Sequence, residues 1–213
     1  MRTLALAALT LAAAASPARA ADSAKDLAAR MQKFYESTTT LHAKFEQELQ
    51  SPIAGTKRAS GDVWLKKPGK MRWEYEKPEK KYMIADGSSL WVYEPEDEQA
   101  FKQSLKTSSL PSSVTFLFGT GRLGEEFTIT LATDVPAPPG DVALKLVPIK
   151  PTAQYRYLVF VVDGRSAMVK QTYVYDQNEG VNHMTFGEVQ TNQPVADGKF
   201  VFNPPAGTKI IRP

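Results

Sequence analysis

Residues 61–78 read GDVWLKKPGKMRWEYEKP, and apolar and charged residues alternate strictly in the arm that follows the central Pro-Gly pair. In the second half of this stretch, Met71, Trp73 and Tyr75 fall on one side of an extended chain and the charged residues between them fall on the other. A period of two is typical of a strand with one apolar face and one solvated face. With the central Pro-Gly pair as its turn, the stretch predicts a β-hairpin whose apolar face either fills a core or lines a cavity.

The same alternation recurs along most of the chain, between turn signals rich in glycine, proline, asparagine and aspartate. Besides the two hairpin arms, strands are expected near residues 41–49, 82–84, 90–93, 99–105, 127–131, 142–146, 155–162, 167–175, 181–189 and 200–202. We therefore predict an α+β, mostly β fold with a single large antiparallel sheet of about eleven strands. A sheet of that size curls or closes, so a curved sheet is expected.

Two segments have a helical pattern instead. Residues 22–35 place Leu27, Met31 and Phe34 on one apolar stripe at helical spacing. Residues 110–118 begin with a proline in the expected first turn and are strongly apolar. Both helices are expected to cover the concave face of the sheet.

The N-terminal residues 1–20 have the three parts of a cleavable signal peptide. Arg2 provides the positive end, a short apolar run follows, and Ala-Arg-Ala forms the cleavage site. The apolar run is too short to span a bilayer, which takes about 20 residues. We expect residues 21–213 to be exported as a single soluble domain, and removal of Arg2 and Arg19 takes the net charge from +3 to +1.

The chain contains no cysteine. This excludes a disulfide scaffold and cysteine-based metal sites, and it also excludes a lipid anchor attached to a cysteine after the cleavage site. The near-neutral charge gives no indication of nucleic-acid binding. Together with the style of the signal, these features favour the bacterial periplasm as the location.

Motifs for catalysis are weak. Residues 119–124 match G-x-G-x-x-G, but the expected helix before them and strand after them reverse the order of a dinucleotide site. His42 and His183 are the only histidines, and neither has a second ligand at metal spacing. The acidic residues 94–98 lack the ligand pattern of a calcium loop. Paired carboxylates for glycoside hydrolysis stay open, because their separation is spatial. We expect no enzyme activity, no catalytic residue, no metal and no cofactor.

An ordered set of short motifs resembles the outer-membrane lipoprotein carrier family, LolA, over nearly the whole chain after the signal. The matching pieces are His42-Ala43 with Phe45 and Gln47, Ser60-Gly61, the hairpin with Met71-Arg72-Trp73, Ile84-Ala85-Asp86-Gly87, residues 90–93 with Gln99, and Phe200, Phe202, Pro204-Pro205 and Gly207. The resemblance implies an unclosed, half β-barrel in which helices form a lid over a hydrophobic cavity.

The resemblance also implies a function and partners. Members of this family accept acylated lipoproteins from an inner-membrane lipoprotein-releasing ABC transporter complex and carry them through the periplasm to an outer-membrane receptor, LolB or an equivalent. They act as chaperones in lipoprotein transport and outer-membrane biogenesis, and a monomer is expected here.

Strand parity and the resemblance together select residues for binding of lipid acyl chains. These are Leu27, Met31, Phe34, Val63, Leu65, Met71, Trp73, Tyr75, Val114, Phe116, Leu117 and Phe118. The family's arginine before the hairpin proline corresponds to Lys67, which is expected to hold the lid through hydrogen bonds to backbone carbonyls. For each apolar residue, ordinary core packing is the alternative, and for Lys67 the alternative is a solvated charge at a strand end.

Two other functions fit the same residues. The protein could be a carrier or sensor of this family for another amphiphile, such as a glycolipid. It could also be a periplasmic interaction domain that transports nothing and whose cavity is a filled core. A hydrolase fits the sequence least well.

Overall fold

The computed structural model describes residues 24–105 and 121–212. The predicted signal peptide, residues 1–20, lies outside the described residues. So does the predicted helix of residues 110–118, with the candidate site residues Val114, Phe116, Leu117 and Phe118. Within the described part of the chain, no helix is both long and apolar enough to cross a bilayer.

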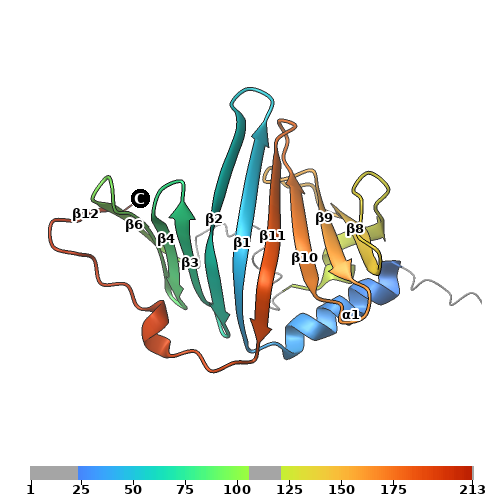
Figure 1. The fold of residues 1–213 in the computed structure, drawn as a ribbon, viewed down its shortest axis with the longest axis horizontal. Helices are drawn as coiled ribbons and strands as arrows, with labels where there is room; N and C mark the ends of the chain where they lie inside the picture. Colours follow the sequence, from blue (N-terminus) through green and yellow to red (C-terminus); the bar gives the residue numbers. More distant parts are fainter. Residues whose placement is uncertain (1–23, 106–120, 213) are drawn as a thin grey trace, which may run out of the picture.

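In the described residues, twelve strands form one sheet, shown in Figure 1. They are β1 (Thr40–Ser51), β2 (Gly55–Lys66), β3 (Lys70–Lys77), β4 (Lys81–Asp86), β5 (Ser89–Glu94), β6 (Gln99–Ser104), β7 (Phe127–Leu131), β8 (Asp141–Pro148), β9 (Tyr157–Asp163), β10 (Val169–Tyr175), β11 (Val181–Thr191) and β12 (Lys209–Ile211). The order across the sheet is β12-β6-β5-β4-β3-β2-β1-β11-β10-β9-β8-β7. Because β7 and β12 are edges that do not pair with each other, the sheet is unclosed. The predicted fold class is confirmed.

Local hairpins build almost all of this sheet. β1 to β6 form one antiparallel meander and β7 to β11 form a second. The two meanders meet where β1 pairs with β11, which places Phe45 opposite Phe186. β12 is the exception, since it pairs with β6 in parallel.

One face of the sheet, here called the inner face, carries the main core. On it the predicted hairpin aligns Val63 with Trp73 and Leu65 with Met71, and all four side chains are buried. The same cluster continues through Phe45 and through apolar residues of the second meander, and these are Leu144, Leu146, Leu158, Phe160 and Val162. Alternation along each strand therefore produces a single apolar surface that spans both meanders.

Helix α1 (Ala24–Ser37) packs on this inner face and runs across the lower ends of β8 to β10 in Figure 1. The helix was predicted for residues 22–35, and its buried residues are Leu27, Ala28, Met31 and Tyr35. Phe34, which was predicted on the stripe, is only partly buried against the cluster. At 100° per residue the buried residues Leu27, Met31, Tyr35 and Ala28 span one arc of the helix from 0° to about 100°, and Phe34 falls just outside that arc at about −20°. Tyr35 therefore occupies the third position of the buried stripe.

Two parts of the fold differ from the prediction. The strand predicted for residues 200–202 is wrong, because Asp197–Phe200 forms a 3₁₀ turn, η1, and the last strand is β12. The apolar alternation there reflects packing of a loop, since Phe202 lies against Trp91 and Tyr93 on the outer face with ring centroids 5.3 and 5.1 Å apart. In addition, a four-residue helix, α3 (Leu123–Glu126), precedes β7 and was not predicted.

Candidate ligand-binding face and lid

The predicted hairpin residues form the centre of the inner face. The exposed fraction is 0% for Val63 and 4% for Trp73. The Trp73 ring meets Phe45 edge-on with centroids 4.8 Å apart, and Tyr75 is partly buried beside the same Phe45 ring. Aromatic rings at this spacing contribute more than their buried area alone. The sequence prediction that these side chains share one face is correct.

Helix α1 seals the neighbouring part of this face. Leu27 and Met31 belong to the same buried cluster as Trp73. The buried Tyr35 hydroxyl accepts a hydrogen bond of 3.1 Å from the backbone N–H of Val169, and burial raises the Tyr35 pKa. The void beside Tyr35, between the end of the helix and strands β1, β2, β10 and β11, measures about 10 Å³, which is the volume needed to hold about one water molecule. The inner face is therefore covered by the protein's own side chains where α1 lies.

Lys67 contacts the end of α1. Its ammonium group donates hydrogen bonds to the carbonyl oxygens of Tyr35 and Glu36, the latter at 3.2 Å, and its backbone N–H donates to the carbonyl of Thr39 at 2.9 Å. The carbonyls of Tyr35 and Glu36 lie in the last turn of α1, where the helix itself offers no i+4 N–H group and the negative end of the helix dipole favours a cation. Partial burial lowers the Lys67 pKa. The contacts are of the kind expected for a clasp, and the clasp role itself stays a prediction.

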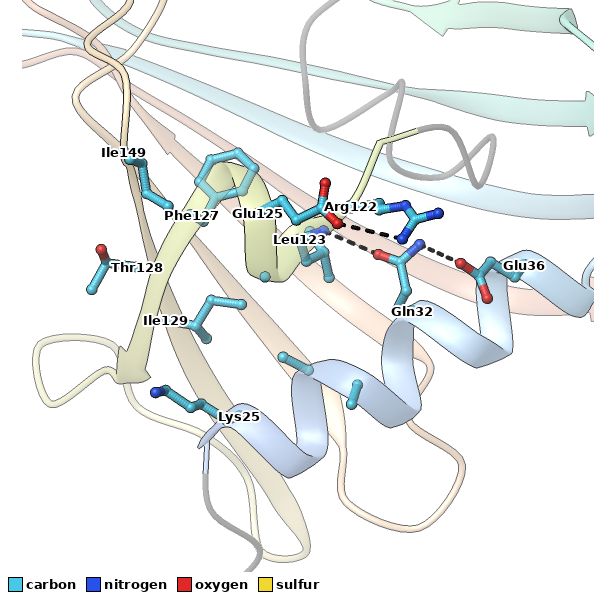
Figure 2. A pocket seen from close by; sticks show the side chains of 13 residues that line it. Lys25, Gln32, Glu36, Arg122, Leu123, Glu125, Phe127, Thr128, Ile129 and Ile149 are labelled. Atoms are coloured by element: carbon cyan, nitrogen blue, oxygen red, sulfur yellow. Dashed lines mark hydrogen bonds and ion pairs between the residues drawn. The ribbon is translucent and has the colours of Figure 1, made fainter.

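A groove of about 670 Å³ lies between α1 on one side and α3 and β7 on the other (Figure 2). Its apolar wall consists of Ala28, Ala29, Leu123, Phe127 and Ile129. Lys25 lies at one end, and Gln32 with Glu36 lies at the other. The small alanines on α1 leave this space open. Leu123, Phe127 and Ile129 also belong to the core cluster of the inner face, so the groove adjoins that face directly.

A comparison with known protein families decides the relationship. The family model described as "Outer membrane lipoprotein carrier protein LolA" matches residues 36–203.

The chain belongs to this family.

Curated relatives extend the match along the chain. The outer-membrane lipoprotein carrier protein of Methylobacillus flagellatus is 26% identical over 213 residues, which cover 99% of each chain. The protein of the same name from Alkalilimnicola ehrlichii is 27% identical over 185 residues, or 86% of this chain and 82% of the relative. An uncharacterized conserved protein from Thermus thermophilus shares the fold, with a TM-score of 0.57 at 14% identity over 89% of this chain and 99% of that one.

Within this LolA-family chain, the hairpin turn that carries Lys67 is also fixed from the outside. The Asp197 carboxylate forms ion pairs with the ammonium groups of Lys66 at 2.9 Å and Lys70 at 2.8 Å. These two ammonium groups lower the Asp197 pKa to about 2. The turn therefore connects α1 on the inner face with the segment that follows β11.

The same segment reaches the connection between α1 and β1. The side-chain oxygen of Asn192 accepts from the backbone N–H of Thr39 at 2.8 Å, and the Asn192 N–H donates to the carbonyl of Thr40 at 2.9 Å. These bonds fix the connection between α1 and β1 to the end of β11. Sequence reasoning did not find them, since the partners lie more than 150 positions apart in the chain.

The outer face carries the polar residues of the hairpin and both histidines. Trp64 faces outward, stacks on His42 with centroids 4.6 Å apart, and lies 3.5 Å beneath the Lys199 ammonium group. His42 also bonds to Asp62 at 2.7 Å. His183 stacks on Tyr173 and bonds to Gln171 at 3.0 Å. Both imidazoles thus have structural partners, and residues 24–105 and 121–212 contain no group of three or more metal-ligating side chains.

Proposed function

We propose that this protein is a periplasmic chaperone that covers the acyl chains of lipoproteins with its inner face during their transport to the outer membrane. The observation that carries the proposal is the apolar inner face itself, which spans both meanders and is sealed over its second half by one amphipathic helix. Family membership supports lipoproteins as the cargo.

The energetic requirement on such a carrier is large. Three acyl chains contain on the order of 40 methylenes, and exposing each to water costs about 0.8 kcal/mol. A carrier must replace most of these contacts and still release its cargo. The inner face meets both needs if Leu27, Met31 and Tyr35 leave it when acyl chains arrive, because one apolar contact then exchanges for another.

The groove beside α1 supplies the route by which a first chain would arrive. Its volume of about 670 Å³ lies within the range of small-molecule sites, about 300–1,000 Å³, whereas the void of about 10 Å³ beside Tyr35 is far too small. A chain in the groove would contact Leu123 and Ile129, which are continuous with the inner face. We propose that loading begins there and proceeds as α1 moves.

The direction of transport follows from the same proposal. Cargo would be received from an inner-membrane lipoprotein-releasing ABC transporter complex and handed to an outer-membrane receptor of the LolB type. Lys67 would hold the last turn of α1 in the empty state through the carbonyls of Tyr35 and Glu36.

Identification of the bound cargo tests the proposal. The protein is purified from periplasm without detergent, and copurifying molecules are identified by mass spectrometry. Acylated lipoprotein is the expected result. Free lipid or glycolipid would make the protein a carrier of another amphiphile, and the absence of both, with no binding of a synthetic triacylated lipopeptide, would contradict the carrier role.

A further inference from the structure

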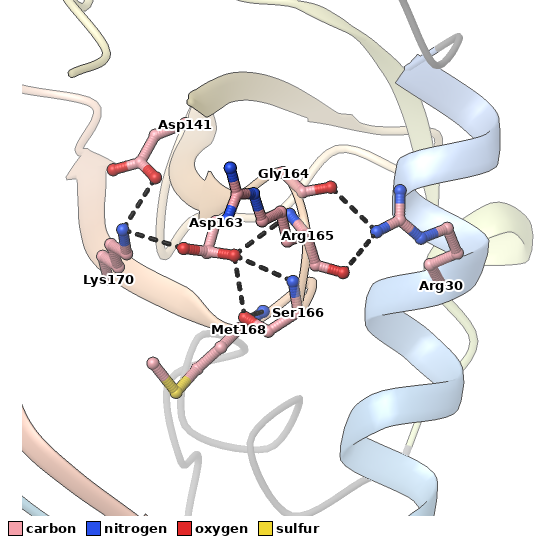
Figure 3. Close-up of polar contacts among 8 residues, drawn as sticks. All are labelled: Arg30, Asp141, Asp163, Gly164, Arg165, Ser166, Met168 and Lys170. Carbon is pink, nitrogen blue, oxygen red and sulfur yellow. Dashed lines mark hydrogen bonds and ion pairs between the residues drawn. The ribbon is translucent and has the colours of Figure 1, made fainter. Parts of the chain in front are cut away.

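Arg30 ties the side of α1 to a turn that lies more than 130 positions away in the chain. Its Nη2 donates hydrogen bonds to the carbonyl oxygens of Gly164 at 2.8 Å and Arg165 at 2.7 Å, as Figure 3 shows. Gly164 and Arg165 belong to the connection between β9 and β10, at the end of the sheet that α1 crosses. A single guanidinium nitrogen therefore joins the helix to the sheet at two points.

The turn holds these two carbonyls in a fixed position. The Asp163 carboxylate accepts from the backbone N–H groups of Arg165 at 3.0 Å and Ser166 at 2.8 Å, and it pairs with Lys170 at 3.0 Å. Lys170 also pairs with Asp141 at 2.7 Å. These contacts lower the Asp163 pKa well below its usual range, so its charge is present throughout the physiological range. The acceptors for Arg30 are thus held in place by contacts that do not involve α1.

Arg30 and Gln32 lie on opposite flanks of α1. At 100° per residue, the direction midway between the buried Leu27 and Tyr35 falls between these two positions. Gln32 faces the groove, where its side chain accepts from the backbone N–H of Leu123 at 3.1 Å and donates to the carbonyl of Gly121 at 3.1 Å. Arg30 faces the β9–β10 turn. The helix is therefore held on each side by polar contacts and at its end by Lys67.

The position of the Arg30 contact suits release. Arg30 is only half-buried, and its bond to the Arg165 carbonyl is exposed. Water can replace both hydrogen bonds when the helix moves, so that no buried polar group is left without a partner. The same replacement is not open to Leu27 and Met31, whose departure requires another apolar surface.

We propose that Arg30 is a latch that sets how often α1 opens on the side of β9 and β10, with the residues around Thr39 as the pivot. The inference rests on the proposed carrier function. It assigns to Arg30 a positioning role: the residue controls access to the inner face without contacting the ligand. Only molecules in which α1 is open can bind, so the apparent Kd equals the intrinsic Kd divided by the fraction of open molecules. A weaker latch raises this fraction and therefore lowers the apparent Kd.

The test compares Arg30→Gln with Lys33→Gln, since Lys33 is an exposed cation on the same helix and outside the groove. The probe is cis-parinaric acid, whose fluorescence rises on transfer to an apolar site. We expect Arg30→Gln to increase the association rate and to lower the apparent Kd several-fold, with Arg30→Lys between it and the unchanged protein. Lys33→Gln should match the unchanged protein in both quantities.

A purely structural role for Arg30 gives a different result. Loss of packing would lower the thermal midpoint and leave binding unchanged or weaker, and that outcome overturns the latch. If Arg30→Gln does not fold, Asp163→Asn decides, because it disorganises the acceptor carbonyls and should also speed association. Failure of the unchanged protein to bind cis-parinaric acid or a triacylated lipopeptide would instead contradict the carrier function itself.

Discussion

The Lys67 ammonium group donates a hydrogen bond to the backbone carbonyl of Tyr35, while the Tyr35 side chain is buried against the sheet with its hydroxyl on the Val169 N–H. The last turn of α1 is thereby attached through its backbone to the β2–β3 turn and through its side chain to β10. The two attachments differ in kind. Water can replace the hydrogen bond from Lys67, whereas the buried Tyr35 side chain needs another apolar surface if it leaves the sheet.

Replacement of Lys67 by leucine should loosen the end of α1. The variant loses two charge-assisted hydrogen bonds, so the free energy of unfolding should fall by about 1–3 kcal/mol in urea titrations. Release of a lipopeptide to the receptor should change more than its uptake. Lys57→Leu, at an exposed position of β2, serves as the control. Transfer kinetics equal to those of the control would argue against the clasp.

The two tryptophans of the hairpin separate the inner face from the outer face. Trp73→Ala removes a buried ring in contact with Phe45, so unfolding free energy should fall by about 3–5 kcal/mol and cis-parinaric acid binding should weaken. Trp64→Ala, on the opposite face of the same hairpin, should leave binding intact. Equal binding defects in the two variants would show that the inner face has no special role.

Local patterns in the sequence were sufficient to predict the sheet and much less informative about the lid. Alternation placed Val63, Leu65, Met71 and Trp73 on one face correctly, because side-chain parity in a strand is a property of neighbouring residues. It failed at residues 200–202, where Phe200 ends a 3₁₀ turn and Phe202 packs on Trp91 from a loop. Pattern alone does not distinguish a strand from an extended loop that a sheet covers.

The groove and the polar contacts of α1 were beyond sequence reasoning for a different reason. Ala28 and Ala29 carry no signal of a binding site, and the groove exists because α3 stands opposite them. In the sequence, Arg30 is an ordinary charged residue of a helix, and only the fold shows that the β9–β10 turn lies beside it. Contacts between residues more than 100 positions apart depend on the register of the whole sheet, which one sequence does not supply.

Asp197 should make the stability of the hairpin turn depend on pH. Lys66 and Lys70 lower its pKa from an ordinary 3.8 to about 2, so the carboxylate stabilises the folded state above pH 3.8 and loses this effect as the pH falls through about 2. The thermal midpoint of Asp197→Asn should therefore lie below that of the unchanged protein at pH 7 and converge with it near pH 2. Molar salt should reduce the difference, because the group is exposed. Asp97→Asn, at the exposed tip between β5 and β6, is the control and should leave the thermal midpoint at pH 7 unchanged.

Filling the groove tests whether loading begins there. Ala29 is exposed and lines the groove, so Ala29→Trp occupies space that an acyl chain would use without disturbing the buried face of α1. We expect slower association of cis-parinaric acid and an unchanged thermal midpoint. Lys33→Trp adds the same ring outside the groove and should bind at the normal rate.

A label at the same position gives an independent measurement. The chain has no cysteine, so Ala29→Cys offers a single thiol for an environment-sensitive dye. A brominated fatty acid should quench the dye at Ala29→Cys before it quenches the same dye at a second site, Tyr75→Cys, on the inner face. Simultaneous quenching at both positions would mean that the chain reaches the inner face by another route. The order of the two signals therefore distinguishes a groove that loads the carrier from one that lies beside it.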